Sequence, residues 1–213
     1  MKKIGSAIIL AGGKSIRMGF DKQKVLIGGV SMVCYIAEQL EKLFEEIIIV
    51  TNTPDYYKEL GSCEKYKIVW DIYKEKGPLG GLHVGLLNAS SEWAYVIACD
   101  MPIVNTAYIL MMKQLIVKEK LDGHHTFGCV TELKGFVEPF NAFYSTAKHS
   151  DVEKGILMGH LKFSRFVLEH NSRVIEEEQA LKYSKDLTMF MNLNTLMNLK
   201  KNDLLGGVIN LPA

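Results

Sequence analysis

The chain has 213 residues, 48% of them hydrophobic and 23% charged, which is the composition of an ordinary globular protein. Its formal net charge of +1 lacks the basic excess of proteins that wrap nucleic acid, so we expect no nucleic-acid partner. The four cysteines form no CxxC pair, and no apolar run reaches the roughly 18 residues of a membrane span. We therefore expect a cytoplasmic protein that has no membrane partner.

The first 120 residues alternate between short apolar runs and segments with helical periodicity. The runs are typical of strands buried on both faces. We expect strands at 4–10, 47–51, 66–70 and 93–99, and helices at 31–44, 54–60, 79–89 and 106–119. This alternation predicts an α/β fold in which βαβ units build a mostly parallel central sheet flanked by helices.

After residue 120 the rhythm changes, because two expected strands follow one another without a clear helix between them. They lie at 126–131 and 136–144 and predict an antiparallel addition to the sheet. We further expect helices at 145–157, 161–169 and 195–201, and short strands at 173–177 and 189–193. Without a linker or repeat, residues 1–205 are interpreted as one domain with a nucleotide-binding half (about 1–120) and an acceptor half (about 121–205). Residues 206–213 are interpreted as a tail.

A pair of glycines, Gly12 and Gly13, ends the first strand and invites comparison with two common phosphate-binding loops. A P-loop has the pattern GxxxxGK[ST], but Ile8 occupies the position of its first glycine. A dinucleotide fingerprint has the pattern GxGxxG, and the glycine that it requires is replaced by Lys14 or by Ser15, depending on the starting point. Neither pattern is therefore present.

The loop nevertheless has the chemistry of a phosphate site. Glycines let backbone N–H groups approach an anion closely, and open α/β sheets bind ligands at the carboxyl ends of their strands. The planar guanidinium of Arg17 can donate two hydrogen bonds to phosphate oxygens, and the ammonium group of Lys22 adds a positive point charge. The alternative interpretation is a tight turn with solvated lysines.

Polar side chains follow three other expected strands at the same edge of the sheet. Asp100 ends the strand 93–99, Asp71 follows 66–70 and Asn52 follows 47–51. Opposite a triphosphate loop, the Asp100 carboxylate favours Mg²⁺ ligation, although an aspartate in this position is also a common helix cap. The segment Gly77-Pro78-Leu79-Gly80-Gly81 precedes a helix, so its backbone could face a base or a sugar.

Together these pieces resemble the molybdenum cofactor guanylyltransferases, the MobA family of nucleotidyltransferases. The family's LAGGxSxRMGxDK loop is matched in full by residues 10–22, and its GPLxG segment is similar to residues 77–81. Its CDxP metal site is similar to Cys99-Asp100-Met101-Pro102, and its NxNT motif to Asn192-Leu193-Asn194-Thr195. The matches keep their order over residues 4–200.

The resemblance implies a Rossmann-like fold and transfer of GMP from Mg·GTP to the terminal phosphate of molybdopterin or Mo-molybdopterin, with release of pyrophosphate. By this resemblance Asp100 would hold Mg²⁺. With Arg17, which the chemistry of the loop assigns to phosphate, Lys22 and Asp100 are the expected catalytic residues. GTP would be bound by Leu10, Ala11, Gly12, Gly13, Lys22, Asn52, Asp71, Gly77, Pro78, Leu79 and Asp100. Asn192 and Asn194 would contact the acceptor, and molybdoenzymes or other cofactor-biosynthesis proteins would be further partners.

Two departures from the family pattern fall in the acceptor half. Leu196-Met197-Asn198 follows NxNT where the family usually has proline and an acidic residue, and Glu138-Pro139-Phe140 replaces the frequent Gln-Pro-Leu. Two alternatives therefore stay open: a nucleotidyltransferase that uses CTP or a sugar phosphate, and a non-catalytic nucleotide-binding chaperone for molybdoenzymes. The choice of guanine over cytosine and the oligomeric state do not follow from the residues.

Overall fold

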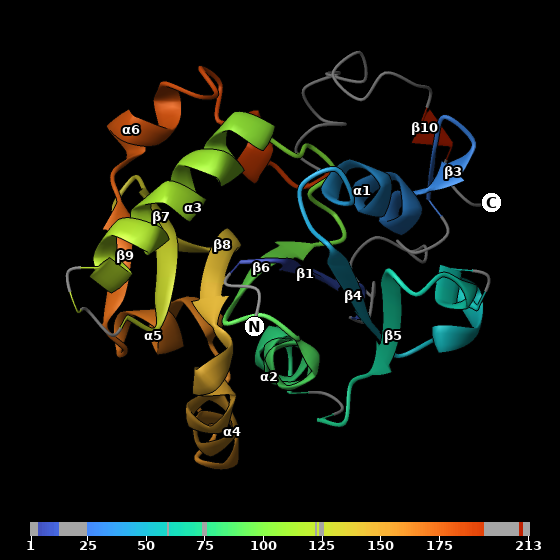
Figure 1. Cartoon of the computed structure of the whole chain (residues 1–213), viewed down its shortest axis with the longest axis horizontal. Coiled ribbons are helices and arrows are strands. Elements are labelled where there is room, and N and C mark those ends of the chain that lie inside the picture. Colours follow the sequence, from blue (N-terminus) through green and yellow to red (C-terminus); the bar gives the residue numbers. More distant parts are fainter. Residues whose placement is uncertain are drawn as a thin grey trace.

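The computed structural model describes residues 4–12, 25–58, 60–73, 76–121, 123, 126–193 and 209–210. A seven-stranded sheet forms the centre of this part of the chain, in the strand order β5-β4-β1-β6-β8-β7-β9 (Figure 1). Its strands are β1 (Ser6–Leu10), β4 (Glu46–Thr51), β5 (Tyr66–Trp70), β6 (Trp93–Ala98), β7 (Gly128–Leu133), β8 (Phe136–Ser145) and β9 (Ser172–Ile175). A small antiparallel sheet joins β10 (Ile209–Asn210), β2 (Leu26–Ile27) and β3 (Val30–Ser31).

The first four strands of the large sheet are parallel, as the sequence predicted. β1 pairs with β4 and β6 in register, so that Leu10 lies opposite both Val50 and Ala98. β5 extends the sheet beyond β4, with Trp70 opposite Thr51. All residues of β1 are buried, which explains the apolar run at 7–10. The carboxyl ends of these strands therefore share one edge.

The antiparallel addition in the C-terminal half is also confirmed. β8 runs antiparallel to β6, with Val96 opposite Ala142, and antiparallel to β7. β9 then lies parallel to β7 at the edge of the sheet. The β7–β8 register shifts between Cys129 and Thr131, which marks an irregularity in the middle of β8.

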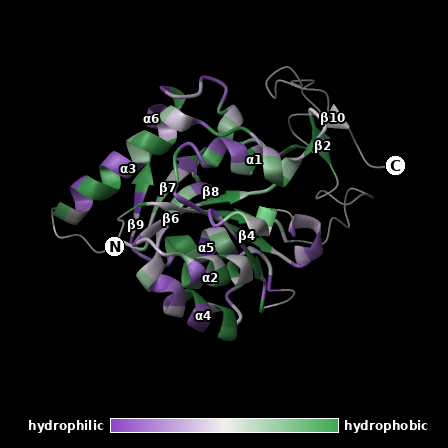
Figure 2. Ribbon diagram, turned by 45° about the vertical axis from the view of Figure 1, so that its right-hand side comes forward, coloured by the Kyte–Doolittle hydropathy of each residue, from purple (hydrophilic) through white to green (hydrophobic). Residues whose placement is uncertain are grey.

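Helices cover both faces of the sheet and bury two hydrophobic clusters against it (Figure 1). One cluster packs beneath α1 (Met32–Leu40) and α3 (Thr106–Leu121), and includes Ala180 of α6 (Glu177–Leu181). The other lies against α2 (Pro78–Asn88), α4 (His149–Leu157) and α5 (Phe163–Leu168). β1 alternates between them, because Ala7 and Ile9 enter the first cluster and Ile8 and Leu10 the second. Figure 2 shows hydrophobic residues gathered along the central strands.

Helix α2 lies unusually close to the central strand. A Cβ built on Gly85 would lie 2.7 Å from Cγ2 of Ile8, well inside contact distance. Both glycine and isoleucine are needed here, since the branched side chain of the strand occupies the volume that a larger helical residue would take. One turn earlier, a Cβ on Gly81 would lie 3.2 Å from Cδ2 of Leu10 and 3.7 Å from Cγ1 of Val50, so the start of α2 packs against the ends of β1 and β4.

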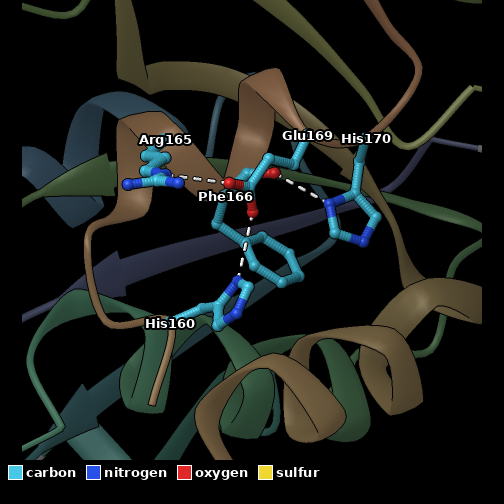
Figure 3. Close-up of polar contacts among 5 residues, drawn as sticks. All are labelled: His160, Arg165, Phe166, Glu169 and His170. Atoms are coloured by element: carbon cyan, nitrogen blue, oxygen red, sulfur yellow. Dashed lines mark hydrogen bonds and ion pairs between the residues drawn. The ribbon is translucent and has the colours of Figure 1, made fainter. Parts of the chain in front are cut away.

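The end of α5 is held by exposed polar contacts (Figure 3). Glu169 accepts a hydrogen bond from Nε of Arg165 at 2.9 Å and pairs with Nδ1 of His160 at 3.1 Å. The ring of His170 stacks on Phe166, with centroids 4.1 Å apart. Arg165 is three-quarters exposed, so these contacts fix a turn rather than a core.

Three expectations about local structure differ from the observed elements. The expected strand 189–193 is wrong, because a 3-10 turn, η5 (Thr188–Phe190), follows Leu187, whose backbone is left-handed (φ 52°). The expected helix 54–60 forms two 3-10 turns, η2 (Pro54–Tyr57) and η3 (Leu60–Ser62). The expected helix 145–157 begins with a 3-10 turn, η4 (Thr146–Lys148). The expected helix 195–201 lies outside the described residues.

Among the residues that the structure describes, no helix is long and apolar enough to cross a membrane.

Candidate active site

The candidate site is built on the shared carboxyl edge of the four parallel strands. Ala11 continues the ladder beyond β1 by donating from its backbone N–H to the carbonyl of Val50 at 2.8 Å. Cys99, which follows β6, donates in the same way to the carbonyl of Leu10 at 3.1 Å. These hydrogen bonds extend the pairing of the strands to the first residue of each following loop. The residues that follow the strands therefore lie close together at one edge of the sheet.

Gly12 and Asn52 lie against one another at this edge. A Cβ built on Gly12 would lie 3.4 Å from Nδ2 of Asn52, which is ordinary van der Waals contact. The turn that carries Asn52 is shaped by Thr51, whose Oγ1 accepts from the backbone N–H of Thr53 at 3.0 Å. Two residues that the sequence assigned to nucleotide binding, from different strands, are thus adjacent.

Asp71 lies between the end of β5 and the first turn of α2. The residue is 8% exposed, and its Oδ1 accepts a hydrogen bond from the backbone N–H of Tyr73 at 3.0 Å. Burial raises the pKa of this carboxyl, and the hydrogen bond from Tyr73 opposes that effect. A Cβ on Gly80 would lie 3.0 Å from the same Oδ1, so glycine at this position makes room for the carboxylate.

The loop that follows Asp71 is joined to the C-terminal half of the chain. The Tyr73 hydroxyl donates to Oε1 of Glu153 on α4 at 2.5 Å. The Tyr73 ring also meets His83 of α2 edge-on, with centroids 5.2 Å apart. The position of Asp71 therefore depends on packing between α2 and α4 as well as on its own strand.

The segment that begins α2 brings backbone rather than side chains to the site. Gly77 precedes the helix with a left-handed backbone (φ 67°), and Pro78 occupies the first helical turn. Leu79 is fully buried in the core, and Leu10 is 7% exposed. Contacts of these two leucines with a nucleotide would therefore be made by their backbone groups.

Asp100 follows β6 and is linked to the C-terminal segment of the described chain. Its backbone carbonyl accepts a hydrogen bond from the N–H of Leu193 at 2.6 Å. This bond places Asn192, the predicted acceptor-binding residue, next to a residue bonded to Asp100. The two motifs, which are far apart in the sequence, are thus brought together by the fold.

Glu138 is a neighbour of Asp100 that the sequence identified only as a departure from the family pattern. The printed pairing of β6 and β8 ends at Val96 and Ala142, and beyond it Glu138 lies close enough to Asp100 for the two charges to interact. The pKa of the Glu138 carboxyl is raised to about 7, mainly by burial and in addition by the negative charge of Asp100. The hydrogen bond that it accepts from the Phe140 N–H at 3.1 Å opposes this shift.

The predicted residues Gly13, Arg17, Lys22 and Asn194 lie outside the described residues. Within the described ranges, no group of three or more His, Cys, Asp or Glu side chains could hold a metal ion. Mg²⁺ requires only one or two protein carboxylates when phosphate oxygens and waters complete its octahedron. The carboxylate of Asp100, with that of Glu138 nearby, fits this requirement.

Comparison with known proteins decides the family. The family model described as "MobA-like NTP transferase domain" matches residues 7–173. This chain belongs to the MobA-like NTP transferase family. The resemblance predicted from the motifs is confirmed, and with it the assignment of the chain as a nucleotidyltransferase.

Two curated relatives of this MobA-like chain match over nearly its whole length. A molybdenum cofactor guanylyltransferase of Syntrophotalea carbinolica is 42% identical over 199 residues, covering 93% of this chain and 90% of the relative. A probable molybdenum cofactor guanylyltransferase of Peptoclostridium acidaminophilum is 44% identical over 201 residues, covering 94% and 89%. The similarity thus extends beyond the matched domain into the C-terminal segment.

A solved structure supports the MobA-like fold. The molybdopterin-guanine dinucleotide biosynthesis protein A from Archaeoglobus fulgidus has a TM-score of 0.73 at 24% identity, covering 92% of this chain and 96% of that one. At this identity the likeness concerns the fold alone. It agrees with the Rossmann-like sheet and its antiparallel addition.

Proposed function

We propose that this MobA-like transferase transfers GMP from GTP to the terminal phosphate of molybdopterin or Mo-molybdopterin and releases pyrophosphate. The observation that carries the proposal is the convergence of Gly12, Asn52, Asp71 and Asp100 at one edge of the parallel sheet. The names of the two relatives, which both specify a molybdenum cofactor guanylyltransferase, supply the base and the acceptor.

The chemistry requires the site to reduce repulsion between anions. Each pair of unit charges 4 Å apart costs about 1 kcal/mol in water and about 4 kcal/mol at an effective dielectric constant of 20. Arg17, Lys22 and the backbone N–H groups of residues 10–13 would offset this charge on the triphosphate. Mg²⁺, when bound at Asp100, would neutralise further charge on the phosphates.

The remaining groups would orient the two substrates. A phosphate nucleophile is already ionised near neutral pH, so no strong general base is required and catalysis rests on positioning and charge stabilisation. Asn52, Asp71 and the backbone of Gly77, Pro78 and Leu79 would hold the nucleoside. Asn192 and Asn194 would hold the acceptor beside Asp100.

A nucleotide panel tests this proposal against the other nucleotidyltransferases. Purified protein is mixed with molybdopterin and with GTP, CTP or ATP, each with and without Mg²⁺, and pyrophosphate release is measured alongside the dinucleotide product. We expect turnover only with GTP and Mg²⁺. Turnover with CTP instead would establish the first alternative, a cytidylyl or related transferase.

Thermal shifts in the same mixtures test the non-catalytic alternative. A shift with GTP but no pyrophosphate release under any condition would favour a nucleotide-binding chaperone. The cytoplasmic location, and hand-over of the product to molybdoenzymes or other cofactor-biosynthesis proteins, belong to the same proposal. Co-purification of the tagged protein with a molybdoenzyme from a cytoplasmic extract checks both.

A further inference from the structure

Asn141 is a buried residue with a left-handed backbone in the middle of a strand. It is 2% exposed and has φ 50°. It belongs to the irregular part of β8: while β7 advances from Cys129 to Thr131, β8 runs from Phe143 back to Glu138. Bulges of this kind near active sites redirect the side chains around them.

The side-chain amide of Asn141 joins three separate parts of the chain. Oδ1 accepts a hydrogen bond from the Tyr95 hydroxyl of β6 at 2.6 Å. Nδ2 donates to the backbone carbonyl of Met189 and contacts Sδ of Met101 at 3.7 Å. All these groups are buried, so the bonds are protected from water and are costly to lose.

These bonds fix the segment 188–193 at two points. Met189 is held by Asn141, and Leu193 is held by the backbone carbonyl of Asp100. Asn192 lies between the two attachments. Its distance from Asp100 is therefore set partly by Asn141, although Asn141 itself is buried beneath the edge.

Asparagine meets both demands of this position. It tolerates the left-handed region better than most residues that have a side chain. Its amide offers an acceptor to Tyr95 and a donor to Met189 at once, whereas aspartate has no donor when ionised and glycine has neither. The residue type thus follows from the backbone and the two partners together.

We propose that Asn141 is a positioning residue for the acceptor: it holds the segment 188–193 so that Asn192 faces the acceptor phosphate beside Asp100. The proposal rests on the function proposed above. Asn141 is only 2% exposed, so we expect it to touch neither substrate, and its contacts toward β6 are with Tyr95 and Met101. Its removal should therefore affect the two substrates unequally.

The variant Asn141→Gly keeps the left-handed backbone and deletes both bonds of the amide. We expect the KM for molybdopterin to rise about tenfold, the loss that one or two buried hydrogen bonds produce. The KM for GTP and the thermal shift with GTP should stay within about twofold of the parent's. An equal rise in both KM values, or no rise, would overturn the proposal.

Two further variants separate positioning from general destabilisation. Lys134→Gly replaces another residue with a left-handed backbone (φ 52°) in the turn between β7 and β8, and should change neither KM. Asn141→Asp keeps the acceptor for Tyr95 and loses the donor to Met189. It should reproduce the unequal effect, and it serves as the test variant if Asn141→Gly does not fold.

Hydrogen exchange gives a readout that does not depend on turnover. The amides of residues 188–193 should exchange faster in Asn141→Gly than in the parent or in Lys134→Gly. If the parent does not transfer GMP to molybdopterin, the proposed function fails, while faster exchange still shows that Asn141 holds this segment. Unchanged exchange together with an active parent contradicts the positioning role alone.

Discussion

The two halves of the sheet, which we propose to bind the nucleotide and the acceptor and call the nucleotide side and the acceptor side, build the candidate site in different ways. On the nucleotide side, β5, β4, β1 and β6 are parallel, and each places the residue that follows it at the common edge. On the acceptor side, β8 runs the opposite way, and the residues near Asp100 come from the interior of a strand and from a docked segment. The backbone ladder positions the first set, whereas the side-chain bonds of Asn141 and one backbone hydrogen bond from Leu193 position the second.

This difference indicates where substitutions can act separately. A change on the nucleotide side alters a group that directly follows a strand of the parallel ladder, so the Kd and KM for GTP should change. A change on the acceptor side alters the packing of residues 188–193 against β8, so the KM for the acceptor should change more than the KM for GTP. Asp100 lies at the boundary and belongs to both sides.

The largest effect should therefore come from Asp100→Ala. Removing the carboxylate proposed to hold Mg²⁺ should lower the rate of pyrophosphate release at least about 100-fold at any Mg²⁺ concentration. The fold should persist, as judged by circular dichroism. Asp151→Ala, which removes a carboxylate of α4 paired with Lys148, is the matched control and should stay active. Near-normal turnover of Asp100→Ala would disprove the metal assignment.

Lys22→Ala should have the next largest effect and should confine it to the nucleotide side. Loss of one cation from the triphosphate loop should weaken GTP binding and lower turnover together, each about tenfold or more. Calorimetry with GTP measures the first and pyrophosphate release the second. An unchanged GTP affinity would contradict the role given to Lys22.

Asp71→Asn is expected to act more narrowly. The amide oxygen of asparagine can still accept from the Tyr73 N–H, so the loop should keep its shape and lose only the charge and the second acceptor oxygen. The Kd for GTP should rise about tenfold, as for one charge-assisted hydrogen bond, while the KM for molybdopterin is unchanged. A larger rise in the KM for molybdopterin than in the Kd for GTP would contradict the proposed role of Asp71 in nucleotide binding.

The smallest effect concerns the pH dependence of stability. His83 is 2% exposed, and burial lowers the pKa of its imidazole. The negative charge of Glu153 opposes this shift, and the positive charge of His149 adds to it. Because the unfolded chain binds the proton more readily, the stability due to neutral His83 is fully present above the ordinary histidine pKa and is lost as pH falls below it. The melting temperature of His83→Gln should consequently fall less than the parent's between pH 8 and pH 5. Parallel curves would show that His83 does not titrate differently in the folded state.

Sequence reasoning succeeded where strand ends alone carry the information. The strand 66–70 was predicted with its observed bounds, and Asn52, Asp71 and Asp100 follow their strands at the expected edge. The roles given to them stay predictions. It failed where the structure depends on distant partners. The apolar residues of 189–193 resemble a strand, but they follow Leu187, whose left-handed backbone is not signalled by a glycine or an asparagine. Asn141 was missed because its partners, Tyr95 and Met189, are remote in the chain.

The contact between Gly85 and Ile8 has a consequence for mutational tolerance. Replacing a glycine inside a helix by alanine usually stabilises a protein, because glycine costs roughly 1 kcal/mol of helix propensity. At Gly85 the added methyl group would meet Ile8 at 2.7 Å and push α2 away from the strand. A helix shifted in this way would carry Gly77 and Gly80 with it, so, on the roles proposed for Gly77 and for Asp71 beside Gly80, this substitution should be recorded as a loss of nucleotide affinity.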